Sequence, residues 1–422
     1  MEIINKILWT IAISLILVNS IYFTIKLKGP QFKFISVLKS LKIKKTNNIS
    51  PLDTLIMTLS SKIGVGSLGG IALAIAFGGL GTIFWIWVSA FFLSIITYIE
   101  NTLAIIYKEK DGKYTKSGPS YYIKKGLQNK ALSTIYALII IITYTILFTS
   151  IQNNTITTLT TEIYGLDKIL IALIVTILTS IAIIKGIKTI SNICNKVFPL
   201  MMIIFLTIGL IVLITNLNQI PTLLNTIINE ALSKNAISGG IIYTILLAIQ
   251  KTIFANESGT GTSAIISGTT ENNDCKLQGN MGIIQVYFIN FIVLTTTALI
   301  IGTTKYQNIN IINGIELTKY AFSYHLGSFG EIMLLIIIFL FSFSTLITIY
   351  YYGENCLKFL TKKKMPIKIL KIVTITSIFI GGIIKANIIW LLIDIALAIL
   401  TIINMYAIYK LKDKIIKKHD IM

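Results

Sequence analysis

Charged residues are scarce in this sequence. Of its 422 residues only 13% are charged, while 54% are hydrophobic; a soluble globular domain carries roughly 25% charged residues. The composition excludes a soluble enzyme, and it equally excludes a disordered chain, which needs low hydrophobicity and high charge. One membrane-spanning helix takes about 20 apolar residues, so the hydrophobic fraction has room for about ten or eleven of them.

The residue types that carry most enzyme chemistry are also few. The chain has no arginine, two histidines and three cysteines. His325 and His419 fall outside the apolar runs, which leaves no histidine for a metal site or a catalytic triad within the membrane. Cys194, Cys275 and Cys356 are too far apart in sequence to indicate a disulfide framework or a metal-binding spacing. We therefore expect neither an enzyme nor a bound cofactor.

Acidic residues are outnumbered by basic ones, 17 to 37, which gives a formal net charge of +20. The lysines gather in alternate loops between the apolar runs, as the positive-inside rule describes. They do not form a basic domain interleaved with aromatics, so we expect no binding to nucleic acid. We place the lysine-rich loops and the C-terminus on the cytoplasmic side of a bacterial cytoplasmic membrane, in contact with anionic lipid. The N-terminus is then outside.

Eleven apolar runs are long enough to span a membrane. The first has no small-residue cleavage site after it, so we expect an uncleaved helix rather than a signal peptide. The runs are residues 7–25, 52–77, 81–107, 131–160, 168–185, 189–215, 237–270, 280–302, 328–357, 367–384 and 386–409.

Glycine-rich segments interrupt two of these runs, at residues 60–70 in the second and at residues 255–262 in the seventh. Unwound backbone survives in a membrane only where it is buried or lines a cavity. Because the two breaks are five helices apart, and five is odd, the second unit has inverted topology, as in many secondary transporters. We therefore expect an all-α integral membrane fold with two inverted five-helix repeats. The expected divisions are an extra N-terminal helix and lysine-rich loop over 1–48, the repeats over 49–216 and 217–410, and a cytoplasmic tail over 411–422.

The first break offers several interpretations. Gly64, Gly66 and Gly69 fit the pattern GxGxxG, but no strand precedes them, which argues against a dinucleotide site. Small residues would also allow close helix packing. We favour a third interpretation, in which free backbone amides hold a carboxylate and free carbonyls hold a cation. Lys62, beside the break, would either snorkel to the cytoplasmic side or occupy the place of a cation.

Other ionisable groups lie inside the runs. Glu257, in the second break, is either a structural carboxylate that binds freed backbone amides or a group that handles ions or protons. Lys251, earlier in the same run, is a candidate partner for a carboxylate. Glu100 and Glu354 lie near cytoplasmic ends, which favours an interfacial or gate-pairing role. Asp394 has no obvious partner in the sequence.

Amides and hydroxyls complete the set of candidates. Gln152, Asn153 and Asn154 interrupt an apolar run, where they would bond either another helix or a polar substrate. Ser344 and Thr345 would either bond back to their own helix or provide hard oxygen ligands for Na⁺. The residues alone leave both alternatives open.

Several blocks of sequence, taken in order, resemble those of the alanine or glycine:cation symporter family, the sodium:alanine symporters. The resemblance runs from about Ile49 to Lys412. Any one block is only suggestive, but all of them in this order are highly specific. The blocks are GVGSLGG at 64–70 with AIAFGGLG at 74–81 and FWIW at 84–87, GPSYYIKKGL at 118–127, FANESGTG at 254–261, and FSFST at 341–345 with YYGE at 351–354.

This resemblance implies a fold similar to the leucine-transporter type and a set of substrate-binding residues. The substrate carboxylate would lie near backbone amides of the first break and face the second, under an aromatic lid and beside two amide side chains. The amides are those of Gly64, Gly66 and Ser67, and the facing residues of the second break are Gly259 and Gly261. The lid is Phe254, and the amide side chains are those of Gln152 and Asn154.

The resemblance also implies one Na⁺ site, built from three backbone carbonyls and two hydroxyls. The carbonyls are those of Ser60, Ile63 and Phe341, and the hydroxyls are those of Ser344 and Thr345.

The sequence departs from the family pattern in three places. In the second break, Ser258 and Thr260 replace alanine and leucine, which makes that break more polar. Ser67 stands where the family usually has asparagine, which implies a weaker or missing ligand at a second sodium site. Ile349 stands where a tryptophan would usually line the substrate pocket, and the loss of the indole enlarges that pocket. A substrate larger than alanine then becomes plausible.

The sequence therefore predicts a secondary active transporter that moves a small neutral amino acid, alanine or glycine first, together with Na⁺ by alternating access. Lys62 and Ser67 motivate an alternative, a proton-coupled or uncoupled carrier, and Ile349 motivates a larger neutral substrate. A membrane sensor without turnover is a weaker alternative, because no soluble signalling domain is present.

Overall fold

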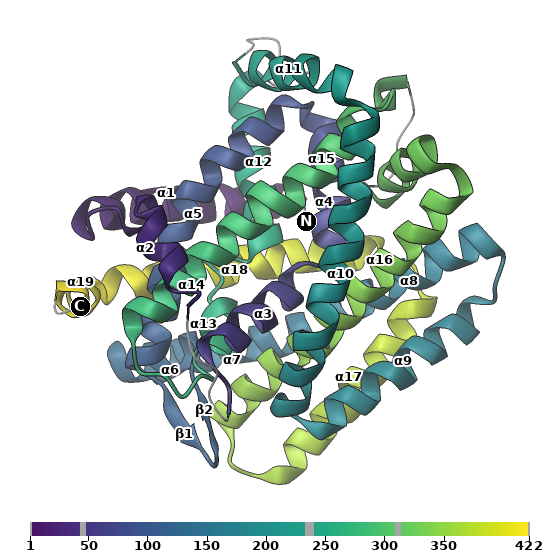
Figure 1. The fold of residues 1–422 in the computed structure, drawn as a ribbon. Coiled ribbons are helices and arrows are strands. Elements are labelled where there is room, and N and C mark those ends of the chain that lie inside the picture. Colours follow the sequence, from purple (N-terminus) through teal and green to yellow (C-terminus); the bar gives the residue numbers. More distant parts are fainter. Residues whose placement is uncertain (1, 43–47, 233–239, 309–313, 421–422) are drawn as a thin grey trace.

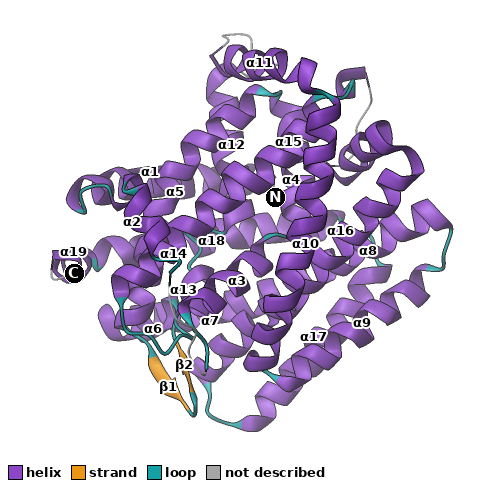
Figure 2. Ribbon diagram, in the orientation of Figure 1, coloured by secondary structure: helices purple, strands orange, loops and turns teal. Residues whose placement is uncertain are grey.

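The computed structural model describes residues 2–42, 48–232, 240–308 and 314–420, and nearly all of these residues are helical (Figure 1). In this part of the chain the strands form one antiparallel hairpin, β1 (Glu109–Asp111) and β2 (Tyr114–Lys116), and short loops join the helices (Figure 2). Large apolar side chains fill the core and also cover outer faces such as that of residues 169–184. A helix that is apolar all round belongs in a large core or a membrane, so the exposed faces suit a lipid environment.

The helices in chain order include three 3₁₀ segments (η1, η3 and η5) and two π-helical segments (η2 and η4). They are α1 (Glu2–Lys26), η1 (Pro30–Phe32), α2 (Phe34–Lys39), α3 (Pro51–Lys62), α4 (Val65–Gly78), α5 (Gly81–Ile106), α6 (Pro119–Gly126), α7 (Lys130–Ile142), η2 (Thr143–Phe148), α8 (Thr149–Tyr164), α9 (Lys168–Lys185), α10 (Ile187–Thr215), η3 (Leu217–Gln219), α11 (Ile220–Leu232), α12 (Gly240–Asn256), α13 (Thr262–Ser267), α14 (Cys275–Tyr287), η4 (Phe288–Leu294), α15 (Thr295–Gly302), η5 (Tyr306–Asn308), α16 (Gly314–Leu360), α17 (Lys364–Ile383), α18 (Asn387–Lys410) and α19 (Lys412–Asp420).

The second apolar run is broken where its glycines predict. Ser50 and Asp53 form a capping box that starts α3, and this satisfies backbone donors at the helix N-terminus. The helix ends at Lys62, and α4 begins at Val65 after a bend of 51°. Gly64 between them is extended, with φ −127° and ψ −156°. The carbonyls at the end of α3 and the amides at the start of α4 are thereby released for other partners.

The seventh apolar run is also broken, between α12 and α13. Glu257, Gly259 and Gly261 in the break have φ values of 49°, 91° and 89°. A Cβ atom on Gly261 would lie 2.2 Å from Cγ of Pro119, so both the backbone angle and the packing require glycine there. The expected start of this run, residues 237–239, lies outside the described residues.

Nine helices in the described residues are long and apolar enough to cross a membrane, and the bent pair of α3 and α4 raises this number to ten. The seventh run is divided between α12, of 17 residues, and the short α13. Residues 314–326, expected as part of a loop, form a helix that joins the ninth run at a kink at Gly327. The number of eleven spans and the inverted repeat stay predictions.

The two broken helices are enclosed by longer ones. Helix α16 packs against α3, α4, α7, α8 and α10, while α5 packs against α12, α13 and α14. Helix α17 lies alongside α8 and α9 (Figure 1). The extra N-terminal helix α1 packs against α18 and α5. Both breaks are therefore buried within the bundle.

Candidate substrate and ion site

Oxygen atoms converge where α3 ends against α16. Thr345 Oγ1 lies 3.1 Å from the carbonyl oxygen of Ser60 and 3.5 Å from that of Ile63. Ser344 Oγ lies 3.3 Å from the Ser60 carbonyl and 3.0 Å from that of Phe341 in its own helix. All five residues are buried. The structure thus brings together three carbonyls and two hydroxyls at the negative end of a half-helix. We call these five groups the oxygen cluster.

The amides of the first break face an amide side chain. Gln152 Oε1 accepts a hydrogen bond of 3.3 Å from the backbone N–H of Val65. Gly64 lies next to the oxygen cluster, because a Cβ atom on it would lie 2.8 Å from Thr345 Oγ1. It therefore stands between that cluster and the contact of Val65 with Gln152. Ser67 Oγ donates a hydrogen bond of 2.7 Å to the carbonyl oxygen of Gly64, the residue just before α4. The start of α4 therefore offers its N–H groups toward Gln152, where the helix dipole favours a negative group.

The amides of the second break are occupied by a carboxylate. Glu100 Oε1 accepts hydrogen bonds of 2.9 Å from the N–H groups of Gly259 and Gly261, and one of 2.8 Å from Asn404 Nδ2. Glu100 is fully buried. The interfacial role expected for it was wrong, because α5 runs against α13 and holds this residue at the break. Gly259 and Gly261, expected to face a substrate, donate instead to this carboxylate.

Glu257 does not bind the freed amides of its own break. Its Oε2 accepts a hydrogen bond of 2.7 Å from Thr262 Oγ1, and it interacts electrostatically with Lys62 at the end of α3. Lys62 is itself buried. The structural role that the sequence offered to Glu257 therefore belongs to Glu100.

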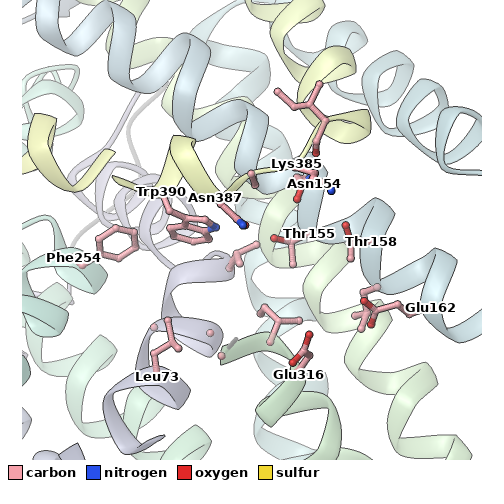
Figure 3. Close-up of a pocket in the computed structure, with 18 of the residues that line it drawn as sticks. Leu73, Asn154, Thr155, Thr158, Glu162, Phe254, Glu316, Lys385, Asn387 and Trp390 are labelled. Atoms are coloured by element: carbon pink, nitrogen blue, oxygen red, sulfur yellow. Dashed lines mark hydrogen bonds between the residues drawn. The ribbon is translucent and has the colours of Figure 1, made fainter. Parts of the chain in front are cut away.

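A cavity of about 490 Å³ lies beside Phe254 (Figure 3). Its walls come from α4, α8, the start of α9, α12, the start of α16, and the α17–α18 connection with the start of α18. The Phe254 ring centroid lies 5.9 Å from those of Phe148 and Trp390. A Cβ atom on Gly66 would lie 2.7 Å from the same ring. Phe254 thus lies between the cavity and Gly66, while Val65, Gly69 and Gly70 of the first break line the cavity themselves.

Polar groups of the cavity have partners in the surrounding helices. Asn154 lines it and donates its amide hydrogens to the carbonyls of Gly381 and Ile384, at 3.0 and 2.6 Å. Lys251 and Asp394 also line it and interact electrostatically. Lys251, a candidate partner for a carboxylate, therefore lies near that of Asp394.

Comparisons with a family profile and with known relatives show the family. A profile of the sodium:alanine symporter family matches residues 1–420. The chain belongs to this family. It is 31% identical over 405 residues to the amino-acid carrier protein AlsT of Bacillus subtilis (strain 168), a match that covers 95% of this chain and 87% of AlsT. It is also 31% identical over 414 residues to the probable sodium/glutamine symporter GlnT of the same organism, covering 96% and 87% of the two chains.

The fold is similar to that of MhsT in complex with L-phenylalanine, with a TM-score of 0.62 over 87% of this chain and 90% of that chain. The sequence identity of this pair is 12%, so the likeness concerns the leucine-transporter type of fold. The chain is therefore a multi-pass membrane transporter of amino acids and not an enzyme. The family predicted from the sequence blocks is confirmed.

In this symporter-family chain the predicted residues fall into three groups. The oxygen cluster contains the predicted Na⁺ ligands Ser60, Ile63, Phe341, Ser344 and Thr345. The first break brings together four of the predicted substrate-binding residues, Gly64, Gly66, Gln152 and Phe254. Asn154 lies in the cavity, while the fully buried Ile349 does not line it. Sequence reasoning missed Trp390, whose only signal was an indole in the last apolar run.

Glu354, in contrast to Glu100, forms an ion pair, and it lies near a lysine-rich segment. It forms a 2.9 Å ion pair with Lys358, which lies 3.1 Å from Asp111 in β1. The hairpin is thereby tied to the end of α16 in this transporter.

Proposed function

We propose that this transporter is a Na⁺-coupled symporter of a small neutral amino acid, with alanine or glycine as the first candidates. The observation that carries the proposal is the oxygen cluster at Ser60, Ile63, Phe341, Ser344 and Thr345. Freed carbonyls at the C-terminal end of a half-helix are ligands for Na⁺ in secondary transporters. A Na⁺ ion bound there would bridge α3 to α16, and so link a broken helix to its neighbour.

The substrate carboxylate is proposed to bind at the N-terminus of α4. Gln152 now accepts from Val65 N–H, and a carboxylate there would gain from the same amides and from the helix dipole. Phe254 is proposed as the lid over this site, because it packs on Gly66 and borders the cavity. The close packing of that ring favours a small substrate. Ile349 remains the argument for a larger one, such as the substrate that the name of GlnT gives for that relative.

The cavity is proposed to open to the outside. Glu162, Lys168 and Lys385 line it, and they flank connections that are poor in lysine. By the positive-inside rule these connections are extracellular, which places the C-terminus in the cytoplasm. The structure then corresponds to a state in which the outer cavity is open as far as Phe254. Alternating access would close this cavity and open the lysine-rich side.

A proton-coupled or uncoupled carrier is the second candidate, favoured by the buried Lys62. Counterflow in proteoliposomes separates the candidates. Vesicles loaded with unlabelled alanine, glycine, serine or glutamine are diluted into labelled substrate in Na⁺ or in choline. We expect exchange of alanine or glycine in Na⁺ and none in choline. Equal exchange in both media would remove the Na⁺ site from the account and leave the fold unchanged.

Substitution of the lid tests the substrate site. Phe254→Ala is expected to raise the substrate concentration for half-maximal uptake by about tenfold, because it removes an aromatic contact and opens the site to water. Phe329→Ala, which changes a phenylalanine that is 56% exposed on α16, serves as the matched control and should leave this concentration unchanged. Wild-type affinity in the Phe254 variant would contradict the role of a lid.

A further inference from the structure

The β1–β2 hairpin holds the segment that leaves the second broken helix. Thr115 Oγ1 in β2 lies 2.7 and 3.0 Å from the carbonyl oxygens of Gly268 and Thr270, which follow α13. Lys108, just before β1, donates hydrogen bonds from Nζ to the carbonyls of Thr270 and Asn272, at 2.9 and 2.7 Å. Since α13 packs against α5, and the hairpin follows α5 in the chain, these contacts make the hairpin part of the α5 and α13 group of helices.

The hairpin also reaches α16. In β1, Asp111 Oδ2 lies 3.1 Å from Lys358 Nζ near the end of α16, and Lys358 also pairs at 2.9 Å with Glu354, one turn earlier. Just after β2, the carbonyl oxygen of Ser117 accepts a hydrogen bond of 2.7 Å from Asn355 Nδ2. We call the Asp111–Lys358 ion pair and the Ser117–Asn355 hydrogen bond the hairpin link. Because α16 packs against α7, α8 and α10, the hairpin link joins the α5 and α13 group to a second group of helices.

The junction at the hairpin link is closely packed. Ser117 and Asn355 are buried, and Ser117 Oγ donates a hydrogen bond of 2.7 Å to the carbonyl oxygen of Ala104 in α5. A Cβ atom on Gly268 would lie 2.2 Å from the Cβ atom of Ser117. Not even a methyl group fits between these two residues, so no solute the size of an amino acid passes between them.

The two attachments of the hairpin differ in how easily they break. Lys108 and Thr115 bind backbone carbonyls at several points of one segment. The side chains of Asp111 and Lys358, in contrast, are 35% and 26% exposed, and water replaces the partner of such a charge at little cost. When α13 moves away from α16, we therefore expect the hairpin to stay with α13 and the hairpin link to break.

The hairpin lies at the edge of the bundle, in the lysine-rich connection between α5 and α6 (Figure 2). In the orientation proposed above this is the cytoplasmic side, opposite the opening of the cavity beside Phe254. An open outer cavity together with a closed inner junction is what alternating access requires of one of its states.

We propose that the hairpin is the inner gate of this transporter: it closes the lysine-rich side while the outer cavity is open, and it opens when the hairpin link to α16 breaks. This inference rests on the proposed function, transport of an amino acid by alternating access. The hairpin contacts neither the proposed substrate site nor the oxygen cluster, and it acts through the segment that follows α13.

A reversible cross-link across the hairpin link tests the gate. Asp111→Cys and Lys358→Cys are introduced together and bridged with a short bis-methanethiosulfonate reagent; the three native cysteines are buried. Without the bridge this variant is expected to take up alanine, since the link breaks in every cycle. The bridge is expected to reduce uptake at least about tenfold, because a gate that stays shut stops turnover, and dithiothreitol should restore it. Uptake that the bridge leaves unchanged would overturn the inference.

A cross-link within the hairpin is the matched control. Glu109 and Lys116 are paired across β1 and β2, so Glu109→Cys with Lys116→Cys is bridged by the same reagent without a connection to α16. Its uptake should be the same with and without the bridge. An equal loss in both bridged variants would overturn the assignment of the gate to the hairpin link. Uptake that is equal in Na⁺ and in choline would instead contradict the proposed Na⁺ symport and leave the gate unaffected.

Accessibility of the junction gives a second measurement. Ser117→Cys is labelled in inside-out vesicles with a membrane-impermeant maleimide, alone or combined with Lys358→Met. Loss of the ion pair is expected to raise the labelling rate about threefold, because the closed junction loses part of its stabilisation. Lys362→Met, which changes an exposed lysine just after α16, should leave the rate unchanged. Equal rates with and without Lys358→Met would show that the link does not keep the junction closed, and would overturn the inference.

Discussion

Thr345→Ala combined with Ser344→Ala is expected to raise the Na⁺ concentration for half-maximal uptake by at least about tenfold, which corresponds to about 1.4 kcal/mol of Na⁺ binding. Thr345 Oγ1 lies within 3.5 Å of both the Ser60 and the Ile63 carbonyls. Ser344 Oγ adds contacts to the Ser60 and Phe341 carbonyls. Two of the five proposed ligands are therefore lost. Uptake as a function of Na⁺ concentration, at saturating alanine, measures the effect.

Ser342→Ala is the matched control for this pair. Ser342 lies on the same helix and is fully buried, and its hydroxyl has no hydrogen-bond partner among the described residues. Its substitution should change the Na⁺ dependence by less than about twofold, since no ligand is removed. If Ser342→Ala and the double variant shift the Na⁺ dependence equally, the effect comes from packing and the Na⁺ site is misplaced.

Gly66→Ala is expected to abolish uptake, whereas Gly70→Ala, one turn further along α4, is expected to retain it. A Cβ atom on Gly66 would lie 2.7 Å from Phe254, closer than carbon atoms tolerate. The ring would have to leave its place against Gly66, beside the cavity. A Cβ atom on Gly70 meets nothing within 4 Å, and alanine is the better helix former by about 1 kcal/mol.

Both variants are compared by uptake and by thermal stability of the purified protein. We expect the Gly66 variant to remain folded but inactive, because the clash is with one side chain rather than with backbone. Uptake by the Gly66 variant at the level of the Gly70 variant would show that Phe254 does not need its observed position for transport.

The positions of the two breaks could be predicted because they depend on local residues. Glycine inside an apolar run is costly in a helix, and the breaks lie at Ile63 and Gly64 and at residues 257–261. The residues that fill these breaks could not be predicted in the same way. Glu100 is 159 residues away in sequence from Gly259, whose amide it binds. Only the packing of α5 against α13 brings them together, and a single sequence has no signal for that contact.

The two interpretations of Ser344 and Thr345 show a second limit. Ser344 Oγ lies near the Phe341 carbonyl of its own helix and also near the Ser60 carbonyl of α3. The bond of Ser344 back to its own helix, which was one interpretation, therefore does not exclude the other, which stays a prediction. A hydroxyl that bonds back to its own helix can still lie within reach of a cation bound between α3 and α16.

The measurement that tests the central claim most directly is accumulation of alanine in proteoliposomes driven by a Na⁺ gradient alone, with a protonophore present to collapse any proton gradient. We predict that labelled alanine rises above its external concentration and falls back when a Na⁺ ionophore is added. The variant with Ser344→Ala and Thr345→Ala should accumulate alanine only at raised external Na⁺. Accumulation that the protonophore abolishes, or that persists in choline, would contradict the account of Na⁺ coupling at the end of α3.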